Sequence, residues 1–595
     1  MNWDNLYPIL DKKFNAQRCL ERVRAIYETD HWNDFSLYEK TADYCARSME
    51  KAGLEQIEML PLKADGKTLY GDWDFPLAWK VHHGTLSYAD GTVVCDYHKV
   101  PCSLTMYSPS TQGPVEAEVV DITNLAELPK DGSLSGKIVL TDKRAAGICA
   151  EAQKAGAVGI LSDQMNLYEG VRLSREELYD ECPWDSLPHR NKDNRLFAFK
   201  LTPRQADTLR EQLKNGPVSM IADVQTESYE GVNYTVSGAL MGTDPTAPEI
   251  FAYGHLYEPG ANDNASGSAA LLELAQCFRE AIEDGLLPQP KRTIRFAMGR
   301  ECGGSMGYLS CHPEKNLLCG GVFDMVGTET IDRATLSIRY DPISNWSFAD
   351  AAIRASVKLY EAYSGNATHF LHNHFRCGIG TDNIIADPLL NVPAVAMVAA
   401  PALSYHSSMD TPDRIEPEIL KRNAMILGVY LYGLADADPE TCDFLRSEIL
   451  DFAAQEQLLA DHPGKQQHNR EAMERALYSL RRIEPALAYE CPAEVIPPIP
   501  DSIGAAGEKI PVRTILGCLT LAAHKPDGAP KFKVSWNAGN HVPLFWTDGK
   551  RNLWQIAVQS AYELGECSEN QLMEKFTYIQ TYFDYLTQLG YIRWL

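Results

Sequence analysis

The stretch that decides the fold runs from residue 249 to residue 275 and reads EIFAYGHLYEPGANDNASGSAALLELA. It begins with a short apolar run that ends in His255, which is typical of a buried strand. Its last part, ASGSAALLELA, has the apolar spacing of a helix, and the preceding Asn262, Asp263 and Asn264 suit a helix N-terminus. A strand, a polar loop and a helix in this order predict one unit of an α/β sheet.

Similar segments continue this pattern along the chain. Apolar strand-like runs occur at residues 293–299, 320–327 and 392–399, and helical periodicity occurs at residues 348–364 and 417–435. Strands that alternate with helices predict an α/β fold, with a mostly parallel sheet and helices on both faces. Ligands bind such sheets at the carboxyl ends of the strands, so we expect functional residues there.

The remaining segments predict further parts of the chain. Residues 136–160 read as a strand, a helix and a second strand, and the Pro-rich sequence CPAEVIPPIP at residues 491–500 reads as a linker. The chain ends with two helices and a strand. We therefore expect an N-terminal part of the sheet domain (1–95), an insert (96–228), the main sheet domain (229–438), a helical extension with linker (439–500) and a C-terminal domain (501–595).

Charge and cysteine content limit the classes of partner. The 595 residues include 80 Asp+Glu and 55 Lys+Arg, which gives a net charge of −25. Such an acidic surface repels nucleic acid and anionic membranes, and it tolerates cationic ligands such as free amino termini. The 15 cysteines show no CxxC spacing, and the N-terminus lacks the basic and apolar regions of a signal peptide. We expect a soluble, cytoplasmic protein with neither nucleic acid nor membrane as a partner.

Five acidic or imidazole residues lie at or near the ends of the predicted strands. His255 ends the first strand, and Asp263 opens the helix that follows it. Glu301, Asp324 and His406 end or follow later strands. Two imidazoles and three carboxylates, one of them able to bridge, are what a site with two zinc ions requires.

Each of these residues also has a structural interpretation. Asp263 suits a helix cap, Asp324 suits a strand-end turn, and an isolated His406 is more often structural than a ligand. His372 and His374 form an HNH sequence with metal-binding side chains, for which a solvated loop is the favoured interpretation.

The order of the motifs resembles the zinc aminopeptidase family, which includes bacterial leucyl aminopeptidase, aminopeptidase Y and glutamate carboxypeptidase. The motifs are GH-x7-DN-x-SG-x3-LLELA, FDMVG, GTDN and YHSSMDTPDRI, and they cover roughly residues 230–435. The resemblance implies the zinc exopeptidase fold, two zinc ions and a peptide substrate. It also implies that Asp263 is the bridging carboxylate and that Asp382 is a motif residue with a less direct role. The metal positions that it implies are His255, Asp263, Glu301, Asp324 and His406.

Other segments resemble accessory domains. The pattern GKIVL…KAGAVGIL, at residues 136–161, resembles the core of a protease-associated domain, a common insert in exopeptidases. The end of the chain resembles a winged-helix domain. The sequence FWTDGKRNLWQIA, at residues 545–557, extends the resemblance to a less studied aminopeptidase-like group with a C-terminal winged helix.

Two positions depart from the family's pattern. The family usually has an aspartate two residues after the first histidine, where it orients the imidazole, and this chain has Tyr257. The family also usually has two adjacent glutamates, the first as general base and the second as metal ligand. Here Arg300 and Cys302 flank the single Glu301.

The catalytic assignments follow from this departure. Glu301 is a candidate for both roles, and if it is a ligand, Glu258 or Asp382 must supply the base. Arg300 is the second catalytic candidate, because a guanidinium binds a carboxylate of the substrate or of Glu301 itself. A surface ion pair is the alternative for Arg300.

Three functions remain compatible with these residues. The first is a metal-dependent exopeptidase, most simply an aminopeptidase, and the second is a degenerate peptidase fold that binds metal, ligand or partner without hydrolysis. The third is a nucleic acid binder that uses the C-terminal domain. From residue 505 onward there are nine Lys+Arg and eight Asp+Glu, a net charge of +1 without a concentrated basic stripe. This balance favours packing or self-association as the role of that domain.

Overall fold

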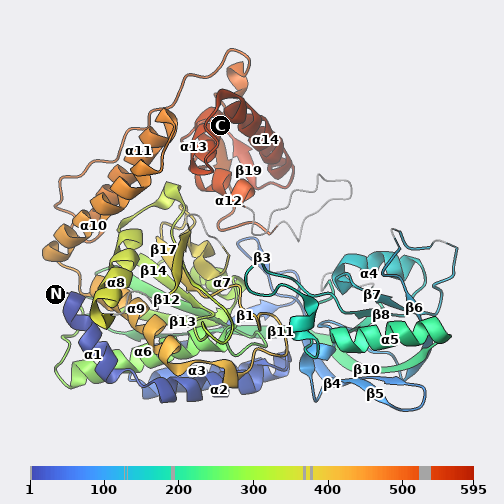
Figure 1. The fold of residues 1–595 in the computed structure, drawn as a ribbon. Coiled ribbons are helices and arrows are strands. Elements are labelled where there is room, and N and C mark those ends of the chain that lie inside the picture. The colour runs from blue at the N-terminus through green and yellow to red at the C-terminus, as the bar shows by residue number, and fades with distance from the viewer. Residues whose placement is uncertain are drawn as a thin grey trace.

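The computed structural model of the chain describes residues 3–125, 127–129, 131–188, 194–365, 370–375, 380–520 and 538–595. It has a large α/β body, a sheet-containing insert beside that body and a helical C-terminal part above it (Figure 1). Helices α10 (Pro439–Leu458) and α11 (Pro463–Ser479) lead from the body to the C-terminal part.

An eight-stranded sheet forms the centre of the body, in the order β1-β11-β13-β12-β14-β17-β15-β16. The pairs β12–β13, β12–β14, β14–β17 and β15–β16 are parallel, and the other three pairs are antiparallel. The predicted α/β fold with a mostly parallel sheet is confirmed. The strands are β1 (Glu55–Ala64), β11 (Gly231–Leu240), β12 (Glu249–Leu256), β13 (Ile294–Arg300), β14 (Leu317–Asp324), β15 (Leu336–Arg339), β16 (His372–Phe375) and β17 (Ala394–Val398).

Helices cover both faces of this sheet. On β14, a side chain at Gly320 would contact Ile385, whereas one at Gly321 would contact Leu427 of helix α9. Neighbouring residues of a strand point to opposite faces, so α9 and the short helix that contains Ile385 lie on opposite sides. The helices of the body are α1 (Leu6–Lys13), α2 (Ala16–Asp30), α3 (Phe35–Lys51), α6 (Ala265–Glu283), α7 (Gly303–Cys311), α8 (Phe348–Ser364), the 3-10 helix η5 (Asp382–Ala386) and α9 (Pro417–Ala435).

Helices α8 and α9 have the bounds that the sequence predicts. Helix α8 starts with a capping box between Ser347 and Asp350, and its last residue is followed by Gly365, whose φ is 60°. Helix α9 has Pro417 at its first position, where a missing backbone N–H costs nothing. Complete local start and stop signals explain why these bounds could be read from the sequence.

A second sheet of seven strands, in the order β5-β4-β10-β6-β7-β8-β9, forms the insert. The predicted strand, helix and strand are present as β7, α4 and β8, and the two strands are parallel. The predicted boundary at residue 96 is wrong, because β4 and β5 belong to this sheet and β4 pairs with β10. The insert elements are β4 (Ala78–Tyr88), β5 (Val93–Asp96), β6 (Val115–Asp121), β7 (Ile138–Thr141), α4 (Ala145–Lys154), β8 (Gly159–Ser162), β9 (Phe197–Lys200), α5 (Pro203–Asn215) and β10 (Ser219–Tyr229).

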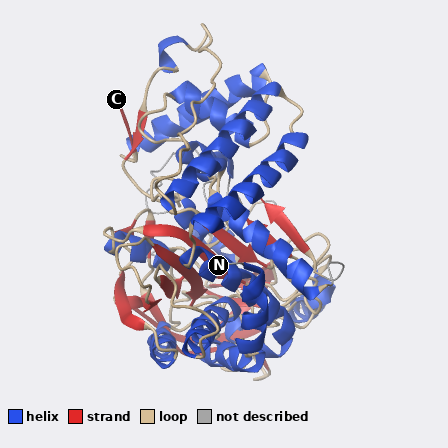
Figure 2. Ribbon diagram, turned by 90° about the vertical axis from the view of Figure 1, so that its left-hand side faces the viewer, coloured by secondary structure: helices blue, strands red, loops and turns tan. Residues whose placement is uncertain are grey.

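The C-terminal part is mainly helical and stands on the sheet body (Figure 2). It ends with the predicted order of two helices and a strand, and the last strand pairs with β18. Its assignment as a winged helix stays a prediction. Within the described residues, no helix is long and apolar enough to cross a membrane. The elements are β18 (Pro511–Arg513), α12 (Ala538–Phe545), α13 (Leu553–Glu563), α14 (Glu569–Gln588) and β19 (Ile592–Trp594).

A buried ion pair joins the C-terminal part to the sheet domain. Arg513 Nη1 and Nη2 donate to the two carboxylate oxygens of Asp387, at 2.9 and 2.6 Å. The two side chains are 1% and 0% exposed. The Gly517 N–H also donates to Asp387, at 2.8 Å. Removing the cation would leave a buried carboxylate without its charge partner.

We predict that Arg513→Met lowers the free energy of unfolding by about 3–5 kcal/mol, because it leaves the Asp387 charge uncompensated. Urea denaturation followed by circular dichroism measures this change. The matched control is Arg593→Met on β19, an exposed position, where we expect a change within about 0.5 kcal/mol. Equal effects of the two substitutions would contradict the assigned role of the ion pair.

Candidate metal centre

The candidate site lies at the carboxyl ends of three neighbouring parallel strands. Strand β12 ends one residue after His255, β14 ends at Asp324, and the loop after β17 carries His406. Asp263 lies between β12 and α6, directly before Asn264, whose side chain caps the helix. The strand order thus brings together four of the five residues that the sequence predicts as metal ligands.

Asp263 lies between the two histidines. Its Oδ1 is 3.4 Å from His255 Nε2, and its Oδ2 is 3.1 Å from His406 Nε2. Asp324 Oδ1 is 3.3 Å from the same nitrogen of His255. One carboxylate therefore faces both imidazoles, as a ligand shared by two metal ions must.

The candidate ligand atoms form two groups that share Asp263. The first group is His255, Asp263 and Asp324, and the second is Glu258, Asp263 and His406. Within each group, all ligand atoms lie within 4.8 Å of one another. From the sequence, Glu258 was only an alternative base, so its place beside His406 is information that the structure adds.

The donor atoms suit a divalent metal. Both groups offer imidazole nitrogen and carboxylate oxygen, which are zinc ligands. Asp324 Oδ1 is buried and accepts no hydrogen bond from a described residue, although His255 Nε2 lies 3.3 Å from it. A buried acceptor without a partner is costly, and a cation in the first group would satisfy it.

The electrostatics of the site also favour a cation. Burial and the charge of Glu258 raise the pKa of both Asp263 and Glu301. Burial and the positive charge of Arg144 lower the pKa of His406 to about 3. His406 is therefore neutral at ordinary pH, which is the form that binds metal. A divalent cation would offset the repulsion among the carboxylates.

Glu301 follows the last residue of β13 and belongs to neither ligand group in the described part of the chain. Asp382, from the GTDN motif, holds the turn that follows Glu301. Its Oδ1 accepts hydrogen bonds from the Cys302 N–H at 2.7 Å and from Ser305 Oγ at 2.6 Å. Burial raises the pKa of Asp382 to about 7. The structure thus gives Asp382 a positioning contact to the segment that carries Glu301.

Backbone strain is present around the site. The non-glycine residues with positive φ include Tyr257 at 69°, Cys302 at 56°, Met325 at 52° and His406 at 55°. Each of them is a candidate residue or lies within two residues of one. A residue in this conformation costs about 1–3 kcal/mol and persists where the surrounding structure enforces it, as in functional sites.

Tyr257, two residues after His255, points away from that histidine. Its hydroxyl donates to the Tyr234 carbonyl at 2.8 Å, and its backbone N–H donates to Asp30 Oδ2 at 2.8 Å. His255 Nδ1 is buried and has no hydrogen-bond partner among the described residues. The described structure therefore contains no replacement for the usual acceptor.

Asp410, in the SSMDTPD sequence, holds the loop that carries Asp263. Its Oδ1 accepts a hydrogen bond from the Asn262 N–H at 2.7 Å, and its Oδ2 accepts one from the Asp263 N–H at 3.0 Å. Its backbone carbonyl accepts one from the Ala261 N–H at 3.1 Å. Asp410 was not predicted as a site residue, although it lies in a motif that the sequence analysis quoted.

Two arginines approach the carboxylates. The Arg300 guanidinium lies 5.8 Å from the centre of the Phe35 ring, and its Nη1 is buried without a hydrogen-bond partner in the described residues. Burial acts to lower the pKa of Arg300, but neighbours that include Glu258 raise it. Arg339, at the end of β15, fills the space that a side chain at Gly380 would need. The glycine of the GTDN motif therefore makes room for this guanidinium.

The insert packs against the His406 loop. The centres of the Trp184 and His406 rings lie 4.3 Å apart, and the backbone N–H of Trp184 donates to the backbone carbonyl of His406 at 3.1 Å. Arg172 Nη2 donates to the carbonyls of Leu403 and Tyr405, at 2.6 and 2.7 Å. The insert therefore helps to position one of the two histidines.

The HNH sequence lies on edge strand β16, so its expected loop conformation is wrong. His372 Nε2 lies 3.0 Å from Glu361 Oε1, and His372 Nδ1 lies 2.9 Å from His374 Nε2. His374 Nδ1 lies 2.6 Å from the Tyr340 hydroxyl. These nitrogens form a hydrogen-bonded chain, and they belong to no metal-binding group of three ligands among the described residues.

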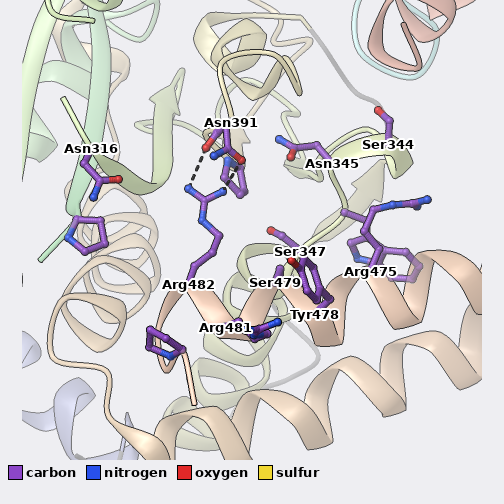
Figure 3. Close-up of a pocket in the computed structure, with 14 residues that line it drawn as sticks. Asn316, Ser344, Asn345, Ser347, Asn391, Arg475, Tyr478, Ser479, Arg481 and Arg482 are labelled. Carbon is purple, nitrogen blue, oxygen red and sulfur yellow. Dashed lines mark hydrogen bonds between the residues drawn. The ribbon is translucent and has the colours of Figure 1, made fainter. Parts of the chain in front are cut away.

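A polar cavity of about 610 Å³ lies away from the candidate metal centre (Figure 3). Pro248, Asn316 and Pro393 line it, and each directly precedes or lies at the start of a parallel strand. The cavity is therefore at the amino ends of these strands. Arg482, which also lines it, donates to the carbonyl and side-chain oxygens of Asn391 at 2.9 and 3.0 Å. We interpret this cavity as a junction between the helical extension and the sheet domain.

Residues 242–431 match the model of Peptidase family M28. A protein named "Probable lipoprotein aminopeptidase LpqL", from Mycobacterium tuberculosis (strain ATCC 25618 / H37Rv), is 30% identical over 179 residues. That match covers 29% of this chain and 32% of LpqL. The chain therefore spans about a third of the length of this curated relative.

Two solved structures are similar to this chain. The Peptidase M28 precursor from Shewanella amazonensis has a TM-score of 0.52 and 18% identity, over 73% of this chain and 98% of that one. BSAP, a zinc aminopeptidase from Bacillus subtilis, has a TM-score of 0.49 and 16% identity, over 72% of this chain and 99% of that one. The first similarity supports the fold.

We predict that Asp410→Asn weakens zinc binding about 10–100-fold, because it removes an acceptor that positions Asp263. Competition between the protein and a chromogenic chelator measures the affinity. Asp413→Asn is the matched control, since Asp413 lies in the same loop but is exposed. An unchanged affinity in Asp410→Asn would show that Asp410 does not support the metal site.

Proposed function

We propose that the chain is a metal-dependent exopeptidase that releases N-terminal residues from peptides, with two zinc ions bound around Asp263. The observation that carries this proposal is the Asp263 carboxylate between His255 and His406. It lies inside the segment that matches peptidase family M28. Its donor set of imidazoles and carboxylates supports zinc as the metal.

The metal ligands, Glu301 and Asp382 have different roles in the proposed hydrolysis. Bound zinc would polarise the scissile carbonyl and lower the pKa of a bound water toward about 7. His255, Asp263, Asp324 and His406 would hold the metals. Glu301 would accept the proton of the attacking water and return it to the leaving amine. Asp382 keeps the turn after Glu301 in place through its contacts to Cys302 and Ser305.

The charges around the site support a free amino terminus as the recognised end. A cationic α-amine is compatible with a site rich in carboxylates. Arg300, whose Nη1 has no hydrogen-bond partner among the described residues, would donate to a carbonyl or carboxylate of the bound peptide. The C-terminal part has a packing role in this proposal, supported by the Arg513–Asp387 ion pair rather than by a basic surface.

A non-hydrolytic binding protein is the second candidate. The observation in its favour is His255 Nδ1, which lacks an acceptor among the described residues because Tyr257 points away from it. Zinc binding without release of amino acids would support this second candidate. Fewer than one metal per chain and no hydrolysis would exclude the peptidase proposal.

We predict that Glu301→Gln lowers the rate of release of N-terminal residues about 10²–10⁴-fold, because it removes the general base. Aminoacyl-anilide substrates and a peptide library measure this release. Glu50→Gln, an exposed position on α3, is the control and should retain the wild-type rate. Equal rates for Glu301→Gln and the wild type would rule out Glu301 as the base.

We also predict that N-acetylation of a peptide substrate abolishes its hydrolysis, because it removes the cationic amine that the carboxylates attract. Mass spectrometry of digests of paired free and acetylated peptides measures the difference. Hydrolysis of the acetylated peptide from its C-terminus would instead indicate recognition of the carboxylate end.

A further inference from the structure

Strand β13 is followed by one glutamate, Glu301, where the zinc aminopeptidase family that the sequence resembles usually has two. Glu301 is followed by Cys302, whose side chain is buried. The Cys302 N–H is bound to Asp382. A thiol at this place does not enter either group of candidate ligands in the described residues. Among the described residues, neither Glu301 nor Cys302 thus contributes a ligand atom to the group around Asp263 and His406.

Glu258 is the carboxylate that the structure places beside Asp263 and His406. It follows Tyr257, whose φ of 69° turns the chain directly after β12. The turn places the Glu258 carboxylate within 4.8 Å of ligand atoms of both Asp263 and His406. The side chain thus reaches the place of the missing ligand from the loop before α6, and not from the end of β13.

The close approach of the Glu258 and Asp263 carboxylates is unfavourable unless a positive charge lies nearby. Two carboxylates side by side in a buried site repel each other and lose hydration. Burial raises the pKa of Glu258, and the positive charges of His255 and Arg300 compensate in part by acting to lower it. A dication held by Glu258, Asp263 and the neutral His406 would offset the repulsion more completely.

We propose that Glu258 is the terminal carboxylate ligand of the second zinc, with Asp263 and His406, and that Glu301 is thereby free to act only as general base. This inference rests on the proposed function. It gives each metal the same kind of ligand set: one histidine, one unshared carboxylate and the shared Asp263. The unshared carboxylates are Asp324 for the first metal and Glu258 for the second. Three protein ligands per zinc leave a position open for water or substrate, as in catalytic sites.

The test compares Glu258→Gln with Glu301→Gln, which make the same change of charge in neighbouring carboxylates. Metal content is measured by elemental analysis after dialysis against buffered zinc, and affinities are measured by calorimetric titration of the metal-free chain with zinc. We expect Glu258→Gln to keep one tight zinc per chain and to bind the second at least about 100-fold more weakly, because a direct ligand is lost. We expect Glu301→Gln to bind two zincs like the wild type while losing activity.

Two further variants complete the experiment. Glu258→Asp keeps the carboxylate on a shorter side chain, and it should retain a second zinc with weakened affinity. It therefore tests the ligand role even if Glu258→Gln does not fold, which circular dichroism detects. Glu283→Gln, exposed at the end of α6, is the control for removal of one acidic charge and should bind two zincs.

The outcomes separate this inference from the proposed function. Two tight zincs in Glu258→Gln, or loss of one zinc in Glu301→Gln but not in Glu258→Gln, would overturn the assignment of Glu258 while leaving a dizinc peptidase intact. A wild-type chain that binds no zinc and releases no amino acid would overturn both. Loss of one zinc in Glu258→Gln together with two zincs in Glu301→Gln supports the assignment, whatever the substrate of the enzyme.

Discussion

The shared carboxylate of Asp263 is the contact on which the site depends. Its two oxygens face imidazoles from different chain segments, so the loop before α6 must stand between the ends of β12 and the His406 loop. Asp410 meets this requirement by binding the N–H groups of Asn262 and Asp263. Buried carboxylates arranged around a single point are stable only when cations balance them. A metal ion bound among these carboxylates would supply that charge.

Much of the fold could be predicted from the sequence because its signals are local. Helix α8 has a complete cap at Ser347 and a glycine at residue 365, so its bounds followed directly. The start of the insert was misplaced because β4 pairs with β10, and nothing near residue 78 reveals a partner at residues 219–229. Long-range pairing of strands is set by the packing of the whole sheet, which a local pattern does not contain.

The candidate site could likewise be predicted from the sequence only in part. His255, Asp263 and Asp324 could be found because strand ends and helix starts place their side chains at one edge of the sheet. Glu258 could not be placed, because its direction depends on the positive φ of Tyr257, a conformation that a tyrosine rarely adopts. The supporting role of Asp410 likewise depends on the path of the loop and not on its composition.

The Arg513–Asp387 ion pair can form only late in the synthesis of the chain. Asp387 follows η5 directly, and η5 begins with Asp382, which holds the turn after Glu301. Arg513 leaves the ribosome after every residue of the candidate site, so the carboxylate beside this helix lacks its partner until the C-terminal part has been synthesised. The ion pair next to the helix that supports the Glu301 turn therefore forms last, and unfinished chains carry the candidate site without it.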